Sequence, residues 1–73
     1  MWIRLLIILN KKCSKRHGWK PYWFYVYGFN GKLIKRIKRF QKKAGLFPSG
    51  ICGKKTHRLI LLKRLLDIKK RKD

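Results

Sequence analysis

The chain has 73 residues, of which 22 are Lys or Arg and only two are Asp or Glu, so its formal net charge is +20 at pH 7. A chain of this length holds one domain at most, and its 45% hydrophobic content excludes a disordered polycation. Because charge of one sign destabilises a compact state, an anionic partner is expected, and the classes to weigh are nucleic acid, a cell-wall polymer and a lipid surface.

The first part of the chain, residues 1–27, is expected to form a helix or strand followed by an aromatic extended segment. Apolar residues at helical spacing predict an amphipathic helix from about Ile3 to Ser14, with an inward face of Trp2, Leu5, Leu6, Leu9 and Cys13. A strand over residues 2–9 is the alternative, because Ile7 and Ile8 are β-branched.

The apolar run at the start of the chain is interrupted by Arg4. It is too short for a membrane span or a signal-peptide core, so we expect a protein used inside the cell.

The segment YWFYVYGF, residues 22–29, follows a connection that contains Gly18 and Pro21. A row of aromatic and β-branched residues is typical of a strand. The sequence therefore predicts a short extended segment here.

Residues 28–68 have the pattern of a helix-turn-helix unit. Asn30 is a good N-cap for a helix near residues 31–44, and Gly45 stands where a left-handed C-terminal cap belongs. The turn FPSGICG leads to a second helix near residues 54–68, and residues 69–73 form a basic tail. We expect the two helices to pack through apolar side chains with Ile51 as a plug between them, the packing residues being Leu33, Ile37, Phe40, Leu59, Leu62 and Leu66.

Within this unit, residues 37–60 resemble the second half of the peptidoglycan-binding-like domain family. The family pattern is a helix ending in Phe-Gln, then Gly-Leu, a turn with Gly-hydrophobic-x-Gly, and a Thr that opens the next helix; the matching residues are Phe40, Gln41, Gly45, Leu46, Gly50, Ile51, Gly53 and Thr56. Ser49 replaces the acidic residue usual before the turn glycine. The resemblance implies a mainly α, small three-helix bundle and non-catalytic binding to cell-wall glycan. Since the matching residues shape a core and a loop, they favour the fold more than the ligand.

Catalytic groups are scarce in this sequence. Asp67 and Asp73 are the only carboxylates, so no acid and base pair for glycoside cleavage can be assembled. Ser14 and His17 lack an orienting acid and are interpreted as polar loop residues. We therefore expect a protein that is not an enzyme and that uses no cofactor.

Two Cys-His pairs are candidate ligands of a zinc ion, which is a minority interpretation. Cys13 with His17 and Cys52 with His57 have the ligand types and number of a tetrahedral zinc site. Their spacings are less diagnostic than paired CxxC knuckles, and Cys52 also fits a small filler in the turn. The favoured interpretation is that no metal is bound and that both thiols are reduced.

The basic residues carry the functional prediction. Cations give salt-dependent affinity for phosphate, and aromatic rings stack on unpaired bases, for which Trp19, Tyr22 and Trp23 are the candidates. The cations expected to contact phosphate lie on the polar faces of the two later helices and in the tail: Lys35, Arg36, Lys38, Arg39, Lys42, Lys43, Lys54, Lys55, Arg58, Lys63, Arg64, Lys69, Lys70, Arg71 and Lys72.

This surface predicts a structural RNA-binding protein of a ribonucleoprotein such as a ribosome, in a bacterial cytoplasm or an organelle. Its partners would be ribosomal or other structured RNA and neighbouring proteins of the assembly. The alternative is a cell-wall binding module of a phage or lytic system, associated with a virion and bound to anionic wall polymer. A membrane partner ranks last, because one short apolar run is a weak interfacial anchor.

Overall fold

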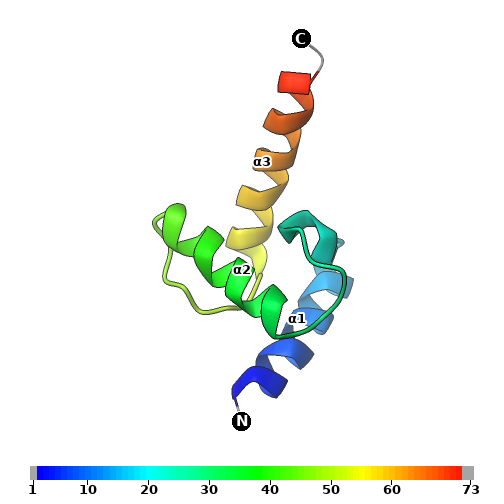
Figure 1. Ribbon diagram of the computed structural model, residues 1–73, viewed down its shortest axis with the longest axis vertical. Helices are drawn as coiled ribbons and strands as arrows, with labels where there is room; N and C mark the ends of the chain where they lie inside the picture. The colour runs from blue at the N-terminus through cyan, green and yellow to red at the C-terminus, as the bar shows by residue number, and fades with distance from the viewer. Residues whose placement is uncertain (1, 72–73) are drawn as a thin grey trace.

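The computed structural model describes the backbone of residues 2–71 and the side chains of residues 3–69. It contains three α-helices, α1 (Trp2–His17), α2 (Gly31–Lys43) and α3 (Lys54–Arg71), and one 3-10 turn, η1 (Pro21–Phe24). Residues 2–71 contain no strand (Figure 1). The predicted mainly α fold with three helices is confirmed.

Helix α1 settles the alternative between helix and strand at the N-terminus in favour of a helix. Its inward face is rotated from the predicted one, because Leu5 is 48% exposed while Asn10 and Ser14 are buried. Hydrogen bonds to backbone groups offset the cost of burying these two polar side chains. The apolar pattern alone therefore predicted the helix but misplaced its face.

The aromatic segment does not form the predicted strand. Pro21 opens η1, and Tyr25 closes it in a left-handed conformation, with φ 63°. This curled path buries Phe24 and Val26 and leaves Tyr25 and Tyr27 exposed. Because the described chain offers no strand to pair with, a compact turn satisfies the backbone instead, and the Tyr25 N–H donates to the Tyr22 carbonyl at 3.0 Å.

Helix α2 has the ends that the sequence predicts. The Asn30 side chain accepts a hydrogen bond from the Leu33 N–H at 3.1 Å. At the other end Gly45 is left-handed, with φ 78°, and the N–H groups of Gly45 and Leu46 donate to the carbonyls of Lys42 and Gln41. These two bonds form a Schellman motif, which ends the helix and turns the chain back.

Helix α3 extends away from the other elements (Figure 1). Thr56 and Ile60 are buried in its first half, whereas Leu62 and Leu66 are 55% and 60% exposed. The predicted packing through Leu62 and Leu66 is therefore wrong, because the buried core reaches along α3 only to Ile60.

The buried core is formed by residues between Trp19 and Ile60, and Cys13 of α1 packs against it. Its buried members come from the segment after α1, from α2, from the turn and from α3: Trp19, Phe24, Val26, Leu33, Ile37, Cys52 and Ile60. Phe40 packs against this cluster from its edge, and Ile51 is half-buried rather than a fully enclosed plug. Residues 19–26 and 33–60 thus share one apolar centre.

Candidate nucleic-acid interface

Gln41 holds the turn from the α2 side. Its Nε2 donates to the Ile51 carbonyl at 2.9 Å and to the Thr56 hydroxyl at 3.0 Å, and its Oε1 accepts from the Gly50 N–H at 3.0 Å. Gly50 is left-handed, and a Cβ added there would lie 3.0 Å from the Lys38 side chain and 3.2 Å from that of Ile34. The residues that carry the family resemblance are therefore engaged in structure.

A second clamp reaches the same turn from α1. Asn10 donates to the Gly50 carbonyl and accepts from the Cys52 N–H, both at 2.8 Å. Trp19 donates through Nε1 to the Cys52 carbonyl at 3.0 Å, and the Ser14 hydroxyl donates to the Trp19 carbonyl. With its polar groups paired internally, the turn leaves ligand binding to the outer surface.

The outer surface carries exposed cations on all three α-helices. Each Lys and Arg from Arg4 to Lys69 is exposed except Arg64, which is half-buried, and Asp67 is the one acid whose side chain is described. The predicted phosphate-contacting residues from Lys35 to Lys69 therefore reach solvent. The side chains of Lys70 and Arg71 and the whole of Lys72 lie outside the described part.

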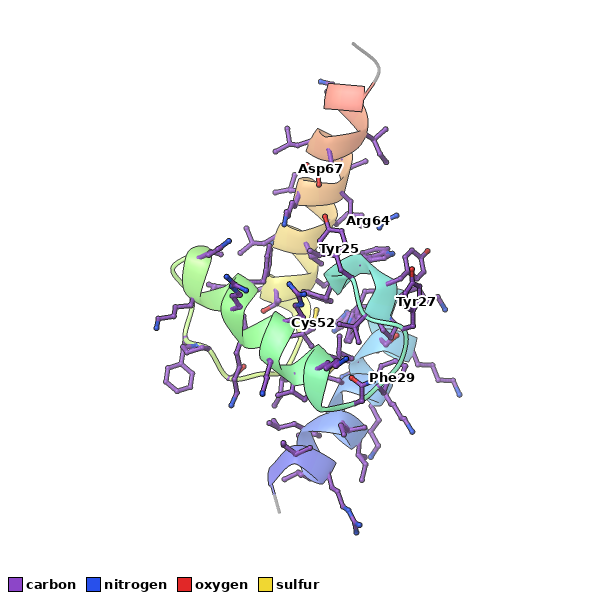
Figure 2. All side chains as sticks on the ribbon, in the orientation of Figure 1. Tyr25, Tyr27, Phe29, Cys52, Arg64 and Asp67 are labelled. Atoms are coloured by element: carbon purple, nitrogen blue, oxygen red, sulfur yellow. The ribbon has the colours of Figure 1, made fainter. Side chains whose placement is uncertain are left out.

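A groove lies between α2 and the segment that follows η1. Tyr25 and Tyr27 form one wall and cations of α2 form the other, and the groove has a volume of about 610 Å³. We call it the tyrosine groove; its lining is Tyr25, Val26, Tyr27, Asn30, Lys32, Lys35, Arg36 and Arg39. From α3, the Lys63 ammonium lies 5.7 Å from the centre of the Tyr25 ring. Figure 2 shows Tyr25 and Tyr27 on this segment, with Arg64 of α3 near Tyr25.

Trp23 lies within a stack of rings and a cation. The His57 ring stacks on it with centroids 6.0 Å apart, and the Arg64 guanidinium lies 4.7 Å from its centroid. Arg64 also lies 5.4 Å from the Tyr22 ring. Trp23 is therefore half-buried, with His57 and Arg64 already beside its ring, whereas Tyr22 remains half exposed.

The structure changes which aromatic residues are available to stack on bases. Trp19 is 0% exposed and belongs to the core, so its predicted stacking role is wrong. Sequence reasoning missed Tyr25 and Tyr27, which are 69% and 97% exposed. The available signal was the alternation Tyr-Val-Tyr, in which buried Val26 directs both neighbours outward.

The two Cys-His pairs come close together without forming a metal site. The rings of His17 and His57 stack with centroids 5.6 Å apart. Among the side chains that the structure describes, no three His, Cys, Asp or Glu are arranged to hold a metal ion. Burial, and then the neighbouring Cys13, raises the pKa of the Cys52 thiol to about 12, so this sulfur is held in the neutral form that binds metals poorly. Cys52 lies at the centre of the molecule (Figure 2).

No described helix combines the length and apolar character needed to cross a bilayer. Comparisons with protein-family models, with curated proteins and with solved structures found no match. The resemblance of residues 37–60 to peptidoglycan-binding-like domains accordingly remains an expectation from those residues.

Proposed function

We propose that this protein is a non-enzymatic RNA-binding component of a ribonucleoprotein. The observation that carries the proposal is the surface: from Arg4 to Lys69 the cations are solvent-exposed with one half-buried exception, and one acid lies among them. A surface that only keeps a protein in solution normally mixes both signs. Phosphates of a folded RNA would neutralise this charge and relieve its self-repulsion.

The cell-wall alternative rests on the turn, and the geometry of the turn gives it less support. Gln41, Gly50 and Thr56 satisfy one another or the backbone, so their agreement with the family pattern is explained without a glycan. Neutral sugars give a binding module no use for a charge of +20. We therefore rank RNA above wall glycan.

A direct comparison of the two ligands tests the proposal. The untagged protein is incubated at 150 mM salt with purified ribosomal RNA or with purified peptidoglycan, in parallel with peptidoglycan stripped of its anionic polymers. We expect retention on RNA and salt-sensitive retention on the unstripped wall only. Retention on stripped peptidoglycan that resists salt, with no binding to RNA, would overturn the proposal and favour the glycan module.

A further inference from the structure

Tyr27 contributes an aromatic side chain that the fold does not use. The residue is 97% exposed, so its ring buries almost no apolar surface on folding. Large aromatic side chains ordinarily stabilise proteins through burial. A ring left in water beside cations therefore calls for a different explanation from packing.

Tyr25 adds a second such ring under a backbone constraint. Its φ of 63° is a left-handed conformation that favours Gly or Asn, and Tyr25 is the one residue other than glycine in the described chain that adopts it. Its ring is nevertheless 69% exposed. A strained position occupied by a bulky exposed side chain suggests that the side chain itself is needed.

Cations line the same groove as both rings. Arg36 and Arg39 of α2 line the tyrosine groove together with Tyr25 and Tyr27, and they also line the adjoining hollow that runs toward Lys63. Guanidinium groups bind phosphate oxygens in pairs of hydrogen bonds, and tyrosine faces stack on bases. The groove thus offers the two kinds of contact that a nucleotide chain requires.

We infer that the tyrosine groove binds unpaired nucleotides, with bases stacked on Tyr25 and Tyr27 and the phosphates between them on Arg36 and Arg39. This inference rests on the proposed RNA-binding function and specifies its partner: a single-stranded loop, bulge or end rather than a continuous helix. In a duplex the base faces are already stacked on one another and cannot reach the tyrosines. Trp23 does not serve this role, because His57 and Arg64 already lie beside its ring.

Two fluorescent probes of equal length test the inference: a 12-nucleotide oligouridylate and a 12-base-pair RNA duplex, each titrated by anisotropy at fixed salt. Stacking on an aromatic side chain contributes about 1–3 kcal/mol per base. Tyr27→Leu and Tyr25→Leu should therefore each weaken oligouridylate binding roughly 5- to 150-fold. Both should leave duplex binding unchanged, because the cations remain.

Two controls separate stacking from charge and from misfolding. Tyr27→Phe keeps the ring and should bind oligouridylate like the wild type. A single-stranded probe of abasic sites has the phosphates without the bases, so the wild type should bind it more weakly than oligouridylate. In Tyr27→Leu this difference should be smaller, and in the double variant Tyr25→Leu with Tyr27→Leu it should disappear. Unchanged thermal unfolding of each variant shows that the fold is intact.

The outcomes distinguish failure of the stacking site from failure of the proposed RNA-binding function. Wild-type binding to duplex and oligouridylate with no loss in either Tyr→Leu variant would overturn the stacking site while leaving RNA binding in place. Equal losses on both probes in folded variants would also overturn it. Binding of the wild type to neither probe would overturn the proposed function itself.

Discussion

The turn at residues 49–53 and the far half of α3 differ in what holds them, although the sequence predicts burial for both. The turn is clamped by buried Asn10 and Gln41 from two helices. From Leu61 onward α3 carries aliphatic side chains that extend into solvent, namely Leu61, Leu62, Leu65, Leu66 and Ile68. Polar residues thus occupy the centre of the fold, while leucines occupy part of its surface.

An apolar pattern therefore predicts burial only where another part of the chain packs against the apolar side chains. α2 ends at Lys43 and the chain turns back through Gly45. The core therefore includes Ile60 and leaves Leu66 exposed. Beyond Ile60, Lys63 and Arg64 lie against aromatic rings of the rest of the chain, whereas Leu62 and Leu66 are exposed. Substitutions in the two regions should consequently differ in their effect on stability.

The largest expected loss comes from breaking the clamp. Gln41→Leu would leave the buried Gly50 N–H and Ile51 carbonyl without partners, at about 1–3 kcal/mol for each group. That sum is comparable with the entire stability of a small domain, about 0.05–0.15 kcal/mol per residue. Urea unfolding followed by circular dichroism measures it, since guanidinium salts would also screen the charge.

Asn30→Ala is the control for the clamp. It removes an exposed N-cap bond to Leu33 and should cost only about 1 kcal/mol. If Gln41→Leu cost no more than Asn30→Ala, the clamp would not hold the fold together.

Matched aliphatic truncations along α3 should give the next largest effect. Ile60 is 2% exposed and Leu66 is 60% exposed. Ile60→Ala should lower the free energy of unfolding by about 2–5 kcal/mol, whereas Leu66→Ala should stay within about 0.5 kcal/mol. Similar losses at the two positions, in urea melts of the isolated protein, would show that the far half of α3 is packed after all.

Alkaline pH should reveal a further stability effect, at Cys52. Burial raises the pKa of its thiol from an ordinary value of 9.0 to about 12 in the folded protein. Between these values the unfolded chain releases the thiol proton while the folded chain keeps it, so stability from this group is present below pH 9 and is lost as the pH rises toward 12.

The variant Cys52→Ala isolates that contribution from the titration of Lys and Tyr. The difference in free energy of unfolding between wild type and variant should be constant below pH 9. Above that pH it should move against the wild type. A difference that stays flat up to about pH 11 would mean that the thiol is accessible to water in the folded protein.

The sequence was a good guide wherever local chemistry decides the structure. Asn30, Gly45 and the apolar period of α2 predicted a helix with both ends in place. Tertiary contacts decided the remainder: Asn10 is buried because its amide matches the backbone of a turn distant in the sequence. No periodicity in α1 signals that match.

The sequence predicted which charged residues of the candidate site are exposed, but not which of its aromatic rings are. In the described part of the chain the lysines and arginines are exposed almost wherever they occur, so their exposure could be predicted from composition. The choice between Trp19 and Tyr27 depended on how the segment YWFYVYGF curls. A 3-10 turn buries Trp19 and Phe24 against each other, with ring centroids 5.7 Å apart, and turns the tyrosines outward.

The salt dependence of RNA affinity tests most directly the central claim that phosphate contacts on α2 and α3 carry the function. If six to ten phosphates are neutralised, the affinity of the wild type for a structured RNA should fall by roughly three to five decades between 50 and 200 mM salt. The double variant Arg36→Gln with Arg39→Gln should make the slope of log affinity against log salt concentration shallower, by the equivalent of about two phosphate contacts. The double variant Lys11→Gln with Lys12→Gln on α1 loses the same charge and should change this slope less. A slope near zero, or equal changes in the two double variants, would contradict the account.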